Sequence, residues 1–224
     1  MDPFGYLPGV PDVVVPEPRW PASLAALAAA GLLAALPSDL TFGPRVGAPA
    51  LIVAILLVLT FLAPMRRHTE SRPQRLLAIA LIAALAITTV VSLVKLVDEI
   101  IAGASADAVS LLIPALQLQG AAIVVFGLAY WELDEGGPHR RIGRHRYDTA
   151  DFRFPQIETP EVRPPGWRPK FIDYLYVAYA NAATFGVGET VPLTHRVKLL
   201  LMLQSAISLT LVTLVAARAV SLLE

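Results

Sequence analysis

Hydrophobic residues are gathered into long runs along this chain, and polar residues are gathered between the runs. A helix needs about 20 mostly apolar residues to cross the roughly 30 Å hydrocarbon layer of a membrane. Five runs qualify or nearly do, at 22–36, 47–65, 76–97, 108–131 and 197–223. The first run is the shortest, and it either crosses the membrane or lies on its surface. The pattern therefore predicts an all-α integral membrane protein with about five transmembrane helices.

Few polar side chains interrupt these runs. Lys95 lies near the end of the third run, where its ammonium can reach water or pair with Asp98 or Glu99. We expect Gln117 and Gln119, within the fourth run, to hydrogen-bond a neighbouring helix. None of these positions resembles a catalytic centre, since no nucleophile lies beside a base.

The stretches outside the runs differ from them in composition. Residues 1–20 contain several prolines and acids, which predicts an extended N-terminal arm before three helices within 21–107. The fourth run ends with Tyr130-Trp131, an aromatic pair typical of the membrane interface. Residues 132–170 are then charged and rich in proline and glycine. Because proline breaks helices, we predict a water-exposed polar loop there.

Composition excludes several classes of function. Hydrophobic residues make up 55% of the chain and charged residues 16%, whereas soluble domains average 45–50% and about 25%. A net charge of zero and the lack of a basic domain argue against a nucleic-acid partner. There is no cysteine, and the four histidines lie in Arg-containing stretches without ligand spacing. We expect a multi-pass protein of the cell membrane, in contact with lipid, that is not an enzyme and has no cofactor.

A shorter apolar segment precedes the last run. Residues 171–183, FIDYLYVAYANAA, are apolar enough to enter a membrane and too few to cross it. Segments of this length are re-entrant, interfacial or core helices. Tyr174, Tyr176 and Tyr179 suit the headgroup level or the wall of a wet cavity.

A glycine-containing loop follows this short segment. Irregular backbone at membrane depth must be buried in protein or line water. A half-helix, a glycine loop and a spanning helix are the parts of an ion-selective pore loop, whose backbone carbonyls replace the water around a cation. Glycine suits such a loop because it adopts backbone angles that a Cβ opposes. The candidate filter residues are Thr184, Phe185, Gly186, Val187 and Gly188, and Glu189 is the candidate acid at the pore mouth. The plainer alternative is a glycine turn that caps a packing helix.

From residue 173 to the C-terminus the chain resembles the pore module of potassium channels. In that family a pore helix leads into T-V-G-Y-G-D, a proline and a threonine follow, and the inner helix opens with a basic residue. The corresponding residues are T-F-G-V-G-E at 184–189, then Pro192, Thr194 and Lys198. Phe185 and Val187 depart from the family motif, and Ser208 stands where many relatives have a hinge glycine.

The resemblance implies a division of residues 108–224. An outer helix at 108–131 and a polar loop at 132–170 would precede a re-entrant helix at 171–184. A filter-like loop at 184–189 and an inner helix at 197–223 would follow. It further implies a monovalent cation such as K⁺ as the transported ligand and a homo-oligomer, a tetramer if the protein is a channel.

A second resemblance covers more of the chain. W-E-L-D-x-G-G-P (131–138), F-P-Q (154–156), P-P-G-W (164–167), D-Y-L-Y (173–176) and Q-S-A-I-S-L (204–209) are similar to a group of uncharacterised bacterial multi-pass proteins. Their segment equivalent to 184–189 does not always keep the glycines. This resemblance implies a channel-like architecture that lacks a working filter in some members. The alternative function is therefore a non-conducting membrane scaffold or accessory protein.

Basic residues are unevenly distributed about the predicted helices. If all five runs span, the arm, the 66–75 loop and the 132–196 region share one side, and with Lys198 they hold fifteen of the eighteen basic residues. The positive-inside rule then places the glycine loop on the cytoplasmic face. Potassium channels have their filter on the outer face, so charge and resemblance predict opposite orientations.

Overall fold

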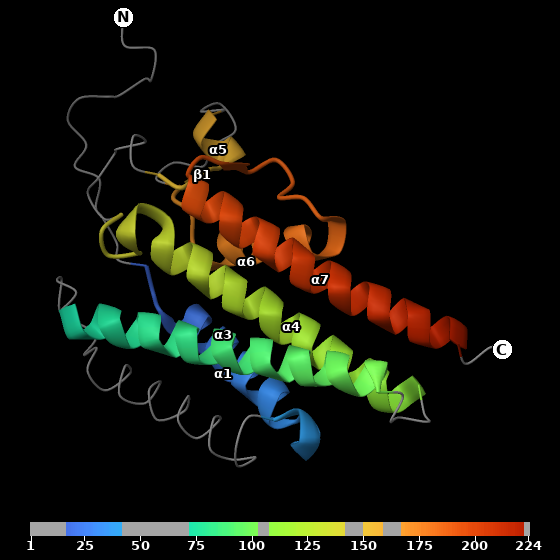
Figure 1. Cartoon of the computed structure of the whole chain (residues 1–224). Coiled ribbons are helices and arrows are strands. Elements are labelled where there is room, and N and C mark those ends of the chain that lie inside the picture. The colour runs from blue at the N-terminus through green and yellow to red at the C-terminus, as the bar shows by residue number, and fades with distance from the viewer. Residues whose placement is uncertain (1–16, 42–71, 103–107, 142–149, 159–166, 222–224) are drawn as a thin grey trace, which may run out of the picture.

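The computed structural model describes residues 17–41, 72–102, 108–141, 150–158 and 167–221 (Figure 1). The elements in chain order are α1 (Trp20–Ala34), η1 (Ser38–Leu40), α3 (Arg72–Ile101), α4 (Ala108–Leu133), η2 (Asp134–Gly136), β1 (Phe152–Arg153), α5 (Pro155–Glu158), α6 (Phe171–Thr184), β2 (Val191–Pro192) and α7 (His195–Ser221). Each strand has two residues, so the predicted all-α class is confirmed. The predicted helix at 47–65 and most of the N-terminal arm lie outside the described residues.

Three helices are long and apolar enough to cross a membrane, with candidate spans at Gln74–Ile101, Leu111–Gly136 and His195–Ala217. They correspond to three of the five predicted runs. A fourth run forms α1, which has 15 residues and is shorter than a full crossing. Large apolar side chains are exposed on the outer faces of the three long helices, among them Ile87, Val94, Leu116, Met202 and Val212. These faces have no covering within the described part of the chain.

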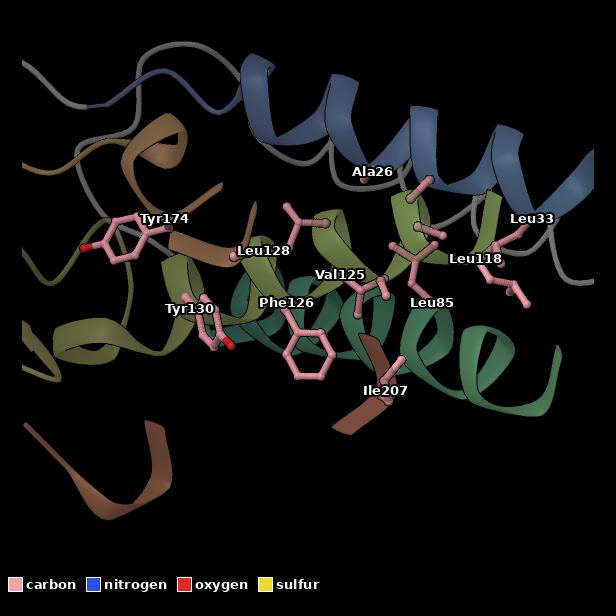
Figure 2. Close-up of a cluster of buried hydrophobic side chains, with 14 of the residues drawn as sticks. Ala26, Leu33, Leu85, Leu118, Val125, Phe126, Leu128, Tyr130, Tyr174 and Ile207 are labelled. Atoms are coloured by element: carbon pink, nitrogen blue, oxygen red, sulfur yellow. The ribbon is translucent and has the colours of Figure 1, made fainter. Parts of the chain in front are cut away.

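Helix α4 lies at the centre of the molecule and packs against α1, α3, α6 and α7 (Figure 1). Figure 2 shows side chains of α4, such as Leu118 and Val125, between Leu33 of α1 and Leu85 of α3. The α1 face that packs inward is made mainly of alanines, which allows close approach of the helices. A Cβ added at Gly120 of α4 would lie 3.2 Å from Leu32 Cδ1.

The helices place chain segments at two ends of the bundle. The cap end, as we call it, holds the start of α1, the end of α4 and the starts of α6 and α7, since Glu17 contacts Phe171 and Arg196 contacts the Leu133 carbonyl. At the opposite end, the Lys95 ammonium donates to the backbone carbonyls of Asp39 (3.2 Å) and Thr41 (2.6 Å). Lys95 therefore reaches the helix end, as expected, and there it binds the η1 turn.

The 132–170 loop is only partly water-exposed, which corrects the sequence-based expectation. Asp134, Asp151, Phe152 and Phe154 are all buried. The rings of Phe152 and Phe154 meet the Tyr174 ring edge-on, at centroid distances of 5.9 and 5.3 Å. The prediction was wrong because these aromatic residues are isolated in a charged sequence, and their apolar partners come from α6. Among the described residues of the loop, the proline-rich part forms only the four-residue α5.

The Tyr130-Trp131 pair, predicted as an aromatic anchor at the membrane interface, faces into the protein. Both rings are buried. The Tyr130 hydroxyl donates to Gln204 Oε1 (2.7 Å), and the Trp131 indole N–H donates to Glu17 Oε2 (3.0 Å). Each polar tip therefore has a protein partner in place of interfacial water.

Candidate functional site

Helix α6 enters the bundle at the cap end and packs against α4 and α7. Its 14 residues give it a length of about 21 Å, which is less than the roughly 30 Å hydrocarbon layer. The two helices α4 and α6 approach closely at Gly127, where an added Cβ would lie 3.1 Å from Leu175 Cα. At the start of α6, the Phe171 ring meets the Trp131 ring edge-on at 5.9 Å. Glycine at 127 thus permits the backbone contact that positions α6.

The first turn of α6 is capped by its own acidic residue. Asp173 Oδ2 accepts a hydrogen bond from the Lys170 backbone N–H (2.7 Å). Partial burial raises the pKa of the Asp173 carboxyl above its ordinary value, and the bond from Lys170 opposes that shift. A carboxylate at this position accepts a hydrogen bond from a backbone N–H group at the helix start. Its negative charge also interacts favourably with the positive end of the helix dipole.

A buried amide cluster holds the second half of α6 against α7. Asn181 Nδ2 donates to the Leu201 carbonyl (3.1 Å) and to Gln204 Oε1 (3.0 Å), while Gln204 Nε2 donates to the Ala178 carbonyl (2.7 Å). Tyr130 of α4 also donates to Gln204, so one side chain joins three helices. Leu201 and Gln204 lie about 9 and 14 Å along α7 from His195. The C-terminal half of α6 is therefore fixed well inside the bundle.

The predicted bonding of Gln119 to another helix is confirmed. Gln119 Nε2 donates to Ser208 Oγ of α7 (3.1 Å). Ser208, which stands at the hinge position of the potassium-channel resemblance, is fully buried. The side-chain oxygen of Gln117 is buried without a hydrogen-bond partner among the described residues.

The chain reverses direction at the end of α6. Phe185 adopts the left-handed conformation (φ 56°) directly after the last helical residue, Thr184. The Thr184 hydroxyl bonds back to the Ala180 carbonyl (2.8 Å) and approaches the Gly186 carbonyl (3.3 Å). Gly188 has the second positive φ of this segment, 63°. We call residues 184–189 the tip.

The six predicted site residues all lie in this tip. Thr184, Phe185, Gly188 and Glu189 are exposed, with half of the Phe185 surface accessible. Gly186 and Val187 are half-buried, and Val187 packs against the hydrophobic core. The positive φ expected of a glycine loop occurs at Gly188 but not at Gly186, because Phe185 takes the left-handed turn itself.

After the tip the chain returns to the cap end. Strand β2 pairs antiparallel with β1, with Phe152 opposite Pro192 and Arg153 opposite Val191. The Leu193 backbone N–H donates to the Asp151 carbonyl (2.8 Å). The short helix and its return thus begin and end on the same side of the bundle.

The α6 tyrosines lie in two different environments. Tyr174 is fully buried, whereas Tyr176 and Tyr179 are 61% and 58% exposed. The exposed pair lies on the outer face of α6, in the turns that lead to the tip. An added Cβ at Gly188 would be 3.9 Å from the Tyr176 hydroxyl, so this ring extends to the level of the tip.

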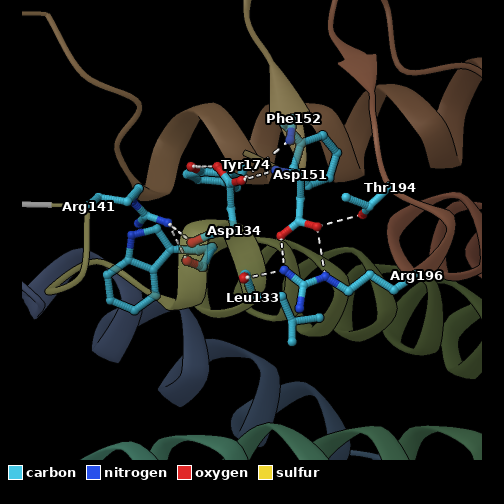
Figure 3. A network of polar contacts seen from close by, with 9 residues as sticks. Leu133, Asp134, Arg141, Asp151, Phe152, Tyr174, Thr194 and Arg196 are labelled. Carbon is cyan, nitrogen blue, oxygen red and sulfur yellow. Dashed lines mark hydrogen bonds and ion pairs between the residues drawn. The ribbon is translucent and has the colours of Figure 1, made fainter. Parts of the chain in front are cut away.

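A polar network at the cap end, which the sequence analysis did not identify, fixes these elements (Figure 3). Asp134 accepts hydrogen bonds from the Tyr174 hydroxyl (2.5 Å) and the backbone N–H groups of Asp151 (2.7 Å) and Phe152 (3.4 Å). The Arg141 guanidinium lies over the Tyr174 ring at 5.1 Å. It donates to the carbonyls of Trp131 (2.8 Å) and Asp134 (3.0 Å). The network therefore joins the end of α4 to α6 and β1.

Asp151 fixes the start of α7 in the same network. Its fully buried carboxylate accepts from Thr194 Oγ1 (2.5 Å) and forms two hydrogen bonds with the Arg196 guanidinium, one of them from Nε at 2.7 Å. Arg196 also donates to the Leu133 carbonyl (3.3 Å). A planar guanidinium opposite a carboxylate gives a directional ion pair. The network is a structural support for α6 and α7. Its groups on Asp134, Arg141, Asp151 and Tyr174 are buried, whereas the Arg196 side chain is 54% exposed.

The motifs of the second resemblance contain part of this network, namely Asp134 and Tyr174. Asp151, Arg196 and Glu17 stand outside those motifs, and only the presence of charges beside helix ends could have suggested them. Among the described residues, no group of three or more His, Cys, Asp and Glu could hold a metal ion.

The chain matches no protein-family model, no curated protein and no solved structure. The geometry of α6 and its tip is therefore the basis for assigning a function.

Proposed function

We propose that this chain is a multi-pass protein of the cell membrane and that four copies form a cation-conducting pore around their tips. The observation that carries the proposal is the path of residues 171–192. The chain enters at the cap end as α6, reverses within the bundle and returns to the cap end at β2. A short helix followed by a return loop and a long helix is the order of parts in a pore loop.

The outer surface supports a membrane environment. The three long helices expose aliphatic side chains along their length, and Lys95 places its ammonium at a helix end. Exposure of so many apolar side chains to water is unfavourable, whereas lipid chains would cover them without loss of hydrogen bonds.

The tip supports assembly. Its irregular backbone would lie at membrane depth, where peptide groups must contact protein or line water. In one chain, Thr184, Phe185, Gly188 and Glu189 are exposed. Copies that meet at the tip would cover this backbone from lipid and leave a wet axis. Carbonyl and hydroxyl oxygens at the tip, with the Glu189 carboxylate, suit a monovalent cation such as K⁺.

Ion flux into reconstituted vesicles tests the proposal. The unaltered protein should pass K⁺, Na⁺ or Rb⁺, and Gly186→Ala should abolish the flux while the fold is retained. Among the described residues, a Cβ at Gly186 would meet only Thr184 Oγ1, at 3.9 Å, so the substitution is sterically mild within one chain. Gly188→Ala should also abolish flux, with added backbone strain from its positive φ.

Gly31→Ala is the matched control, because none of the described residues lies within 4 Å of a Cβ added there. It should leave flux unchanged. Vesicles that contain the unaltered protein in folded form and pass none of the three cations would overturn the pore proposal.

A second candidate, a non-conducting scaffold of the same architecture, is favoured by one contact. The Thr184 hydroxyl bonds to Ala180 and Gly186 of its own chain, as in an ordinary helix stop. A non-conducting scaffold predicts a monomer or dimer in mild detergent, and it predicts that the protein tolerates both glycine substitutions. A stable tetramer would contradict it.

A further inference from the structure

The segment just before α1 lies across the junction between α4 and α6. Glu17 uses both carboxylate oxygens there: Oε2 accepts from the Trp131 indole N–H (3.0 Å) and Oε1 accepts from the Phe171 backbone N–H (2.7 Å). Two residues later, the Arg19 guanidinium lies over the Trp131 ring at 5.8 Å. Residues from the N-terminal part of the chain thus touch the last turn of one helix and the first residue of another.

The environment of Glu17 makes this contact specific. Its side chain is 14% exposed, and a nitrogen of Arg141, whose side chain is 8% exposed, lies 3.7 Å from Glu17 Oε2. Phe171 N–H is one of the first amide groups of α6, which have no acceptor within the helix. A carboxylate at this place both accepts that hydrogen bond and interacts favourably with the helix dipole.

Helix α6 is held at two levels. Near its start it is held by Glu17 and by the bond from Tyr174 to Asp134, and deeper in the bundle it is held by the Asn181–Gln204 amide pair. Because a helix of about 21 Å is stiff, a displacement of its first turn rotates it about the deeper attachment. The tip begins three residues after Asn181, so it would move with that rotation.

We propose that the Glu17 contact makes the N-terminal segment a control element for the tip. While Glu17 is docked, the first turn of α6 is fixed against α4 and the tip has one position. When Glu17 is withdrawn, the start of α6 loses one of its two bonds and keeps the one from Tyr174 to Asp134, so that α6 tilts and the tip changes position. The structural part of this inference is independent of ion conduction, and its effect on flux rests on the proposed function.

Hydrogen exchange on the full-length protein in lipid nanodiscs tests the first step. In Glu17→Ala, the Phe171 amide should exchange about tenfold to a hundredfold faster, as expected for loss of a hydrogen bond to a charged group. Glu17→Gln keeps an acceptor oxygen and should give a smaller increase in the exchange rate of the Phe171 amide. This variant replaces Glu17→Ala in the test if the alanine variant does not fold. The matched control is Asp98→Asn, which removes an exposed carboxylate near the opposite end.

Thiol labelling tests the second step. The native chain has no cysteine, so Glu189→Cys places a single thiol in the tip. Its reaction rate with a charged thiol reagent should change several-fold in the Glu17→Ala background and stay constant with Asp98→Asn. Flux in chains that keep Glu189 should change with Glu17→Ala.

The outcomes separate this inference from the proposed function. Unchanged exchange at Phe171 overturns it, and so does faster exchange with unchanged labelling at the tip, since Glu17 would then cap α6 without controlling it. If exchange and labelling both respond while unaltered protein passes no cation, the control contact stands and the pore proposal fails.

Discussion

The two halves of the bundle are held together by different kinds of contact. Helices α1 and α3 pack on α4 mainly through alanine and leucine, so shape and size determine their fit. Helices α6 and α7 are joined to α4 by directed bonds between polar side chains, with Gln204 and Asp134 at the centres of two networks. Within lipid, close packing of small residues and hydrogen bonds between helices are the two main sources of helix association. The comparison indicates that directed hydrogen bonds fix the positions of α6 and α7, whereas apolar packing positions α1 and α3.

The largest expected effect comes from removing the acceptor at the cap end. Asp134→Ala would leave the Tyr174 hydroxyl and the backbone N–H groups of Asp151 and Phe152 buried without their acceptor. At 1–3 kcal/mol for each unsatisfied group, we expect a loss of about 4 kcal/mol in the free energy of unfolding. Thermal unfolding in detergent measures it. Asp98→Asn, the control, should have little effect, and equal stability of the two variants would contradict a structural role for the network.

Gln204→Leu should have the next largest effect. It keeps the side-chain size but removes the partner of Tyr130, Asn181 and the Ala178 carbonyl. Measured interhelical hydrogen bonds contribute about 0.6–1.7 kcal/mol each, so we expect a loss of about 3 kcal/mol. Ser205→Ala removes only the 3.2 Å bond to Asn181 and should cost less. Equal unfolding temperatures for both variants would show that packing, not polarity, holds α6.

A change of size should matter more in the first half. Ala29 of α1 is fully buried, and Ala29→Leu forces extra methyl groups into close packing, at an expected cost of about 2 kcal/mol. Ala29→Ser is nearly the same size and adds a hydroxyl that can bond within its own helix, so it should be tolerated. If serine destabilised the protein as much as leucine, the contrast between the two halves would not hold.

The smallest effect is expected at Gly31, where a methyl group would have no atom of the described part of the chain within 4 Å. Gly31→Ala should raise stability by less than about 1 kcal/mol, because alanine is the better helix former. A fall in the unfolding temperature would indicate that another chain or segment covers this side of α1.

The sequence predicted the helices far better than the contacts between them. Apolar runs are local signals, so α3, α4 and α7 were found to within a few residues, and the short run at 171–183 was correctly separated from the spanning helices. The cap network was missed because its partners are distant in sequence. Glu17 and Phe171 are 154 residues apart, and no local pattern identifies a half-buried carboxylate between two prolines.

The tip was predicted in part for a related reason. Glycine at 188 has the expected positive φ, yet Phe185 adopts one too, although its Cβ opposes that conformation. The end of α6 is fixed by the buried amide cluster, so the chain must turn at the residue that follows. Local residue preference therefore gave way to a tertiary constraint.

The position of Asp151 has a consequence for biogenesis. The carboxylate that receives the start of α7 is synthesised 45 residues before Arg196, and it directly precedes strand β1. A ribosome would release this carboxylate first and α7 afterwards. Helix α7 therefore docks on a carboxylate that the preceding chain has already supplied, and the pairing of β1 with β2 can form only shortly before α7 emerges.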